Sequence, residues 1–237
     1  MKLDVLAFGA HPDDVELACS GTLLRLINEG KKVGVIDLTE GELGTRGTKE
    51  TRYKESSDAS EILGLDVRLN LNLGDGLFEL NNENRLKVVE VIRKYKPSLV
   101  LANAIEDRHI DHPKGAQLIK EAYFLSGLEK IKSSLDGRDQ EAWRPKHLYN
   151  YIQHYHIVPD FVVDVTPYHD RKMQSVLAYK TQFYNPDSQE SETPISSKRF
   201  LDFLVARGRE MGESIGVEFG EGFTSQGPLS YDLSSLL

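Results

Sequence analysis

Short apolar runs alternate with longer amphipathic stretches through the first half of the chain. The runs rich in Val, Leu and Ile predict buried strands, and the stretches with helical spacing between them predict helices. The predicted strands are Leu3–Gly9, Val33–Leu38, Val67–Leu71 and Leu99–Ala102. The predicted helices are about Val15–Glu29, Thr51–Leu63, Arg85–Tyr95 and one that starts near Pro113. This alternation is typical of βα units.

After Gly127 the alternation of apolar runs and amphipathic stretches becomes less regular. The charged stretch Lys130–Glu141 is predicted to be a solvated connection, and Asn185–Thr193 a mobile loop. Two more strands are predicted at His147–Ile152 and Phe161–Val165, and two more helices at Asp170–Lys180 and about Ser197–Ile215. We therefore expect an α/β fold with a mostly parallel sheet and helices on both faces.

Composition narrows the class of protein. With 237 residues, 39% of them hydrophobic, the chain is long enough for one sizeable core, so residues 1–237 are expected to form one domain. No secretory signal and no apolar run near the ~20 residues of a membrane span is seen, so we expect a soluble, cytoplasmic protein without a membrane partner. The net charge of −8 argues against a nucleic-acid partner.

Cys19 is the chain's one cysteine. A single cysteine excludes an internal disulfide and a cysteine-based zinc cluster, so a metal site here has to use His and carboxylate ligands. Cys19 lies within an apolar pattern and is predicted to be a buried packing residue, with a reactive thiol as the alternative.

The first candidate site follows the first predicted strand, as His11-Pro12-Asp13-Asp14. A strand that ends in this way places an imidazole, His11, and a carboxylate, Asp14, at the mouth of the sheet, where an ion such as Zn²⁺ can accept both. Asp13 is then free to handle protons.

The second candidate site is the segment Glu106–Pro113, which follows the fourth predicted strand. In doubly wound sheets the first and fourth strands are neighbours at the edge where ligands bind, so the two clusters are expected to converge. Convergence predicts His11, Asp14 and His112 as three metal ligands, with a fourth position for water, as in a catalytic zinc site. The same ligands also suit Fe²⁺ or another divalent ion.

An open site of this kind predicts hydrolysis. Asp13 is the candidate general base for the metal's water. His109 is expected to stabilise an oxyanion or to protonate a leaving amine, with Asp111 orienting it and favouring its charged form. The alternatives for His109 are a fourth metal ligand or a structural loop histidine.

These motifs carry a family resemblance. The first cluster through Glu16, the segment His109–His112 and the segment Gly216–Phe223 resemble the LmbE-like, or PIG-L, zinc deacetylases over nearly the whole chain. Within that superfamily, the segments Asp37–Gly44, Arg68–Leu71 and Glu106–His109 look like the bacillithiol branch. That branch removes acetyl from N-acetylglucosaminyl malate.

The resemblance implies a Rossmann-like fold, Zn²⁺ on His11, Asp14 and His112, Asp13 as base, and a homo-oligomer, with a hexamer as one form. It also implies that Arg52 and Arg108 contact substrate. Two guanidiniums suit a dicarboxylate such as malate, although plain salt bridges are the alternative for both.

Three functions are consistent with the sequence. The first is metal-dependent deacetylation of an amino sugar, with the malate glycoside as substrate. The second keeps the site but changes the substrate, to another N-acetylglucosaminide, an acetylated cofactor precursor or an amide conjugate, including a thiol conjugate. The third is a non-catalytic metal- or sugar-binding module. A dinucleotide is not expected, because no Gly-x-Gly-x-x-Gly follows the first strand.

Overall fold

A seven-stranded sheet forms the centre of the computed structural model, which describes residues 1–230. Its strands are β1 (Val5–Gly9), β2 (Val33–Asp37), β3 (Val67–Asn70), β4 (Leu99–Ala102), β7 (His147–Tyr151), β8 (Phe161–Asp164) and β9 (Gly220–Ser225). Their order is β3-β2-β1-β4-β7-β9-β8. The pairs from β3 through β7 are parallel, whereas β9 runs antiparallel to β7 and β8. The mostly parallel α/β sheet is confirmed.

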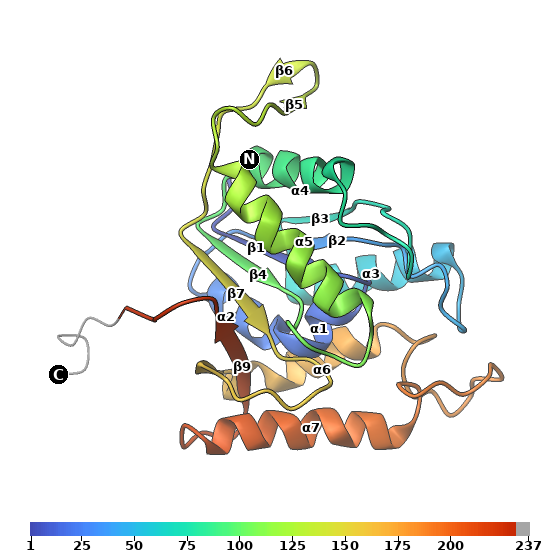
Figure 1. Cartoon of the computed structure of the whole chain (residues 1–237). Coiled ribbons are helices and arrows are strands. Elements are labelled where there is room, and N and C mark those ends of the chain that lie inside the picture. Colours follow the sequence, from blue (N-terminus) through green and yellow to red (C-terminus); the bar gives the residue numbers. More distant parts are fainter. Residues whose placement is uncertain (231–237) are drawn as a thin grey trace.

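Helices cover both faces of this sheet, as predicted (Figure 1). Helices α4 (Asn82–Tyr95) and α5 (Asp111–Ser126) pack on one face, over strand residues such as Leu6 and Phe8. Helices α1 (Asp14–Ala18) and α2 (Ser20–Asn28) pack on the other face, over Val5 and Ala7, which alternate with Leu6 and Phe8 along β1. Because successive strand side chains point to opposite faces, each strand contributes to two cores.

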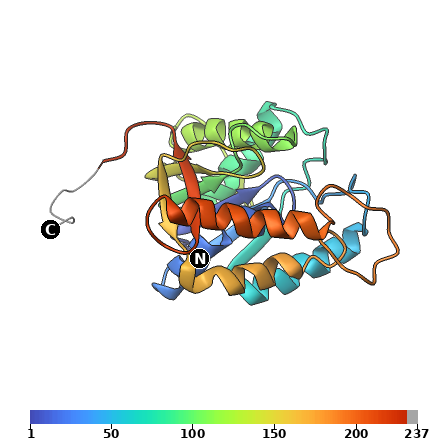
Figure 2. The same ribbon diagram turned by 90° about the horizontal axis from the view of Figure 1, so that it is seen from below.

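Three further helices extend the layer that contains α1 and α2. They are α3 (Lys49–Leu63), α6 (His169–Leu177), which follows the 3₁₀ turn η1 (Thr166–Tyr168), and α7 (Lys198–Glu213). Helix α6 contacts α1, α2 and α3, whereas α7 contacts β8 and β9. Figure 2 shows α7 lying across the outside of the molecule. Within residues 1–230, no helix combines the length and apolar character needed to cross a membrane.

The helix predicted at Val15–Glu29 is wrong as one continuous element, because it breaks at Cys19. Cys19 has non-helical backbone angles, φ −138° and ψ 12°, and is fully buried between α1 and α2. The second helix starts afresh at Ser20, where two N–H groups of its first turn, those of Gly21 and Thr22, donate to the Glu221 carboxylate of β9 at 2.9 and 2.7 Å. A Cβ on Gly21 would come within 2.9 Å of this carboxylate, so glycine is required for the approach.

Sequence patterning missed three strands. Strand β9 is rich in glycine and polar residues, which are depleted in strands, yet its first five residues are buried in the sheet. Within Lys130–Glu141, predicted to be a plain connection, β5 (Ser134–Leu135) and β6 (Arg138–Asp139) form a small antiparallel hairpin. Its turn has Asp136 and Gly137 at positive φ, as two-residue hairpin turns require.

Helices α3, α4 and α5 begin two or three residues earlier than predicted. Thr48 and Asn81 cap the first two, each accepting the N–H three residues ahead, so the polar residues after each cap belong to the helix. Helix α5 begins at Asp111 rather than at Pro113. The early start places Asp111 and His112 in a first helical turn, beside the sheet edge.

Candidate active site

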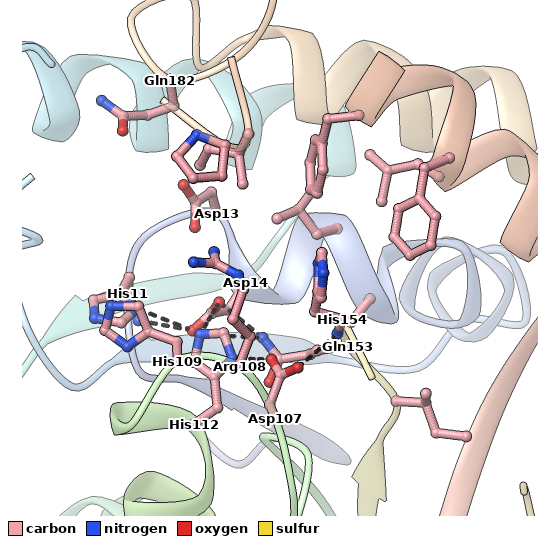
Figure 3. Close-up of a pocket in the computed structure, with 18 of the residues that line it drawn as sticks. His11, Asp13, Asp14, Asp107, Arg108, His109, His112, Gln153, His154 and Gln182 are labelled. Carbon is pink, nitrogen blue, oxygen red and sulfur yellow. Dashed lines mark hydrogen bonds and ion pairs between the residues drawn. The ribbon is translucent and has the colours of Figure 1, made fainter. Parts of the chain in front are cut away.

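The two His/Asp clusters meet at the carboxyl ends of β1 and β4, which are hydrogen-bonded neighbours. The loops that follow these strands leave the sheet side by side, as the topology rule predicts. They bring five of the predicted side chains to one cavity of about 580 Å³: His11, Asp13, Asp14, His109 and His112. Figure 3 shows them at one end of this cavity. The predicted convergence is confirmed.

Asp14 lies at the centre of the cluster. One carboxylate oxygen is 3.0 Å from Nε2 of His112, and the other is 3.6 Å from Nδ1 of His11. Asn103 and Gln153, which follow β4 and β7, donate side-chain amide hydrogens to the same carboxylate at 3.0 and 2.9 Å. Burial opposes ionisation, but His112 and His11 hold the pKa of Asp14 well below its usual range. Asp14 is therefore a fixed, ionised carboxylate between two imidazoles.

The surrounding carboxylates favour the positively charged forms of His11 and His112. Burial disfavours the charged form of His112, yet Asp14 and Asp107 outweigh it and raise the pKa of His112 to about 9. The pKa of His11 is likewise held well above its usual range, by hydrogen bonds to Asp111, Asp14 and Asp75 that outweigh burial. A divalent cation would replace these protons, since metal binding displaces protons from its ligands.

The donor types fit such a cation. Ring nitrogens of His11, His109 and His112 lie within 4.8 Å of one another, and Asp14 adds a carboxylate oxygen beside two of these rings. Imidazole with carboxylate suits Zn²⁺ and Fe²⁺. A second group of potential donors consists of His11, Asp75 and Asp111. Both carboxylates of this group face Nε2 of His11.

Asp75 and Asp107 are site residues that the sequence analysis missed. Asp75, in the loop after β3, is 3.0 Å from Nε2 of His11. Asp107 contacts Nδ1 of His112 and accepts the backbone N–H groups of His154 and Tyr155 at 3.0 Å. Asp107 lay inside the second cluster, but spacing alone does not show which histidine a carboxylate pairs with.

The role predicted for Asp111 needs correction. Its carboxylate faces His11 at 3.3 Å and accepts the Gly76 N–H at 2.7 Å, instead of orienting His109. The Asp111 backbone N–H, at the start of α5, donates to Nδ1 of His109 at 3.3 Å. Because burial, with the charges of His11 and His112, lowers the pKa of His109, the structure favours its neutral form and not the expected imidazolium.

Asp13 has a different partner from its neighbour Asp14. It is buried, and its Oδ2 atom accepts a hydrogen bond from Nη1 of Arg52 at 3.2 Å. In Figure 3 it stands outside the dashed contacts around Asp14. Burial raises the pKa of Asp13 to about 7, although the Arg52 charge opposes the shift. Its φ of 126° is uncommon for a residue with a side chain, and such backbone strain gathers at functional sites.

The two predicted substrate arginines differ in their surroundings. Arg52 lies on α3 and is buried against Asp13. Its contact in the structure is therefore a salt bridge, which was the alternative to substrate binding. Gly41 makes room for it, because a Cβ there would lie 2.6 Å from Nη2 of Arg52. Arg108 is exposed on the wall of the same cavity. Both guanidiniums line the cavity that contains the histidines.

A model of the PIG-L family, described as GlcNAc-PI de-N-acetylase, matches residues 6–123, which carry both clusters. The chain belongs to the PIG-L family. A solved structure, the conserved protein TT1542 from Thermus thermophilus, is 38% identical to this PIG-L chain, covers 97% of both chains and superposes with a TM-score of 0.86.

Curated relatives match this PIG-L chain over parts of their length. The uncharacterized deacetylase YaiS of Escherichia coli (strain K12) is 36% identical over 46% of this chain and 61% of its own. The diacetylchitobiose deacetylase of Thermococcus kodakarensis is 29% identical over 76% of this chain and 70% of its own. The 4-oxalmesaconate hydratase of Pseudomonas putida is 26% identical over 54% of each. The matched part is thus under two thirds of YaiS, and the relatives differ in reaction.

Proposed function

We propose that this protein hydrolyses the acetamide of an N-acetylglucosamine glycoside and releases acetate. The observation that carries the proposal is the different surroundings of two adjacent carboxylates in one cavity. Asp14 lies between His11 and His112, whereas Asp13 lies on Arg52 with a pKa of about 7. One carboxylate can hold a cation while its neighbour exchanges a proton near neutral pH. The deacetylases among the relatives support this reaction.

The residues divide the chemistry among them. His11, Asp14 and His112 would hold a divalent ion, Zn²⁺ in the first instance, with His109 close enough to be a fourth donor. When bound, such an ion supplies Lewis acidity and lowers the pKa of water. Asp13 takes the proton from the water that attacks the acetamide carbonyl and, once protonated, can return it to the leaving amine.

In this proposal His109 stabilises the oxyanion. Its ring centroid is 4.5 Å from that of His11 and 5.1 Å from that of His112, so it borders the place where the carbonyl would lie. A neutral imidazole still has one N–H to donate. Because the Asp111 N–H already donates to Nδ1, the proton of neutral His109 is expected on Nε2.

The particular substrate in this proposal is N-acetylglucosaminyl malate. Arg108 supports it, because an exposed guanidinium on the cavity wall suits a carboxylate of the aglycone. Replacing Arg108 by Met should raise KM for the malate glycoside roughly tenfold or more and leave the methyl glycoside unchanged, since a hydrogen bond to a charged group contributes ~1.5–3 kcal/mol. Equal effects on both substrates would remove malate and leave another N-acetylglucosaminide as the substrate.

The test of the reaction is acetate release from the zinc-loaded protein with a panel of N-acetylglucosaminides, malate-linked and neutral. Acetate is measured directly, because a hydratase also matches the chain. Asp13→Asn should keep its metal and lose most of the activity, while Asp187→Asn, the same change in an exposed loop, should behave as wild type. Full activity in metal-replete Asp13→Asn would contradict the role of the base. The homo-oligomer stays a prediction, which light scattering tests.

A further inference from the structure

The cavity that contains the catalytic cluster extends well beyond it, under helix α7. One face of α7 lines the cavity through residues at helical spacing, from Phe200 through Phe203, Leu204, Arg207 and Gly208 to Met211. Phe200 and Met211, at the two ends, are buried. Phe203 and Leu204, in the middle, are only half-buried. The centre of the apolar face of α7 therefore packs against the core cluster that includes Phe200 and still borders the cavity.

The opposite wall of this space is also apolar. Leu17 of α1, Met173 of α6 and Ile195, just before α7, line the cavity, and each is half-buried. We call the space between these three side chains and Phe203 and Leu204 the apolar chamber. A concave apolar surface of this kind is typical of a ligand site, because apolar area in contact with water is unfavourable and is covered on binding.

The charged side chains near the chamber already have partners. The Lys172 ammonium is 2.6 Å from the Glu221 carboxylate, which also holds the start of α2. Arg207 crosses from α7 to donate to the backbone oxygens of His154 and Tyr155. Figure 2 shows α7 as the outer helix on this side of the molecule. An ionic group in the chamber would therefore have to displace an existing pair.

Helix α7 is anchored at its ends, which leaves the chamber open beneath its middle. At its C-terminal end, α7 lies so close to β9 that a Cβ on Gly220 would be 2.9 Å from the backbone nitrogen of Gly212. At its N-terminal end, Phe200 is buried in a core cluster with Phe183. The chamber therefore lies beneath a helix that is held at both ends.

We propose that the apolar chamber binds an uncharged alkyl or aryl group carried by the amino-sugar substrate. This inference rests on the proposed hydrolysis of a glucosamine amide, and it adds, beside N-acetylglucosaminyl malate, substrates that carry an apolar group. The occupant is assigned to the substrate because Asp13 and His109 line the same cavity as Phe203 and Leu204. Such a group could be the aglycone or an N-acyl group longer than acetyl, and the experiment separates these two sources.

The experiment compares two homologous series on the zinc-loaded enzyme. One is methyl, butyl and hexyl glycosides of N-acetylglucosamine, and the other is N-acetyl, N-butanoyl and N-hexanoyl glucosamine. In one series kcat/KM should rise at least tenfold from the shortest to the longest member, since each buried methylene contributes up to roughly fourfold. A rise with the glycosides assigns the chamber to the aglycone, and a rise with the amides assigns it to the acyl group. Flat or falling values in both series would overturn the proposal.

Matched variants locate the effect. Leu204→Gln should reduce the chain-length gain at least threefold and leave the shortest substrate unchanged. Leu177→Gln makes the same change at an exposed position of α6 outside the cavity lining and should keep the gain. A gain that survives Leu204→Gln and Met173→Gln alike would place the apolar site elsewhere.

Binding is measured separately, so that failure of the proposed function is distinguishable. Calorimetry with hexyl and methyl glycosides of glucosamine, which are product analogues, reports the chamber without turnover. Tighter binding of the hexyl compound that Leu204→Gln abolishes would support the chamber even in a protein that released no acetate. Equal affinity for both compounds, together with flat kcat/KM values in the N-acyl series, would overturn it even in an active deacetylase.

Discussion

Oδ1 of Asp75 lies 3.0 Å from Nε2 of His11, and Oδ2 of the same carboxylate accepts the Leu43 N–H at 2.9 Å. The carboxylate thus joins a metal-ligand candidate to the loop after β2. By accepting the proton on Nε2, Asp75 would leave Nδ1 of His11, the atom nearer Asp14, free to bind a metal ion. Asp75 is therefore a positioning residue in this site.

Asp75→Ala is expected to weaken zinc binding ~10–100-fold, the usual effect of removing the partner that orients a histidine ligand. Competition with a chromophoric chelator measures the affinity without any assay of activity. Asp75→Asn, which retains an acceptor oxygen, should lose less, and Asp187→Ala serves as the exposed control. Wild-type affinity in Asp75→Ala would show that His11 needs no such orientation.

The second prediction concerns Arg52, whose hydrogen-bond partner in the structure is Asp13. Arg52→Met should lower kcat ~10–100-fold on every substrate, since Asp13 loses a charge-assisted hydrogen bond of ~1.5–3 kcal/mol. Metal content should stay at the wild-type value. If Arg52 binds malate instead, KM for the malate glycoside alone will rise while kcat on the methyl glycoside is preserved. The split between kcat and KM distinguishes the two roles.

The ligand candidates could be predicted from the sequence because they follow regular strands. His11 and His112 come after apolar runs of recognisable length, and sheet topology then brings strand ends together. Asp75 carries no such signal, because it lies in a loop whose path depends on tertiary packing. Gln153 does follow a predicted strand, but an amide is neither a usual zinc ligand nor a group that transfers protons. The break at Cys19 could not be predicted from the sequence either, because the hydrogen-bond acceptor at the start of α2, Glu221, is 200 residues from Gly21. Local patterns predicted six of the seven strands of the sheet, all but β9, and the contacts between distant segments required the structure.

Arg68 gives a prediction about stability and pH. Its guanidinium binds Asp37 at 2.8 and 2.9 Å and also contacts Glu16, in a buried network behind the site. Arg68→Met leaves both carboxylates uncompensated and should cost about 3–5 kcal/mol of unfolding free energy at neutral pH. Arg68→Lys, which keeps the charge, should cost less.

The cost of Arg68→Met should shrink at lower pH. Burial already raises the pKa of Asp37, and Arg68 opposes the rise, so the variant's folded-state pKa lies further above the unfolded value. Stability from this group is then greatest below the unfolded pKa, near ~3.9, and is lost as the pH rises through the folded-state pKa. Urea unfolding at about pH 5 and pH 7.5 measures the gap between variant and wild type. An equal gap at both values would contradict the assignment to Asp37.

Glu221 and Lys172 should be strongly coupled in stability. The Glu221 carboxylate accepts from Lys172 at 2.6 Å and from the Thr22 N–H and hydroxyl at 2.7 and 2.6 Å, all in a buried setting. Glu221→Gln should cost about 3–5 kcal/mol, because it leaves a buried ammonium unpaired and weakens the start of α2. Adding Lys172→Met should recover part of that loss, since the double variant contains no unpaired buried charge. Glu218→Gln, an exposed neighbour on the same segment, should change stability by no more than ~0.5 kcal/mol. Urea unfolding of the wild type, the single variants Glu221→Gln and Lys172→Met, and the double variant gives the coupling energy. Strictly additive losses would mean that the pair contributes nothing beyond its separate contacts.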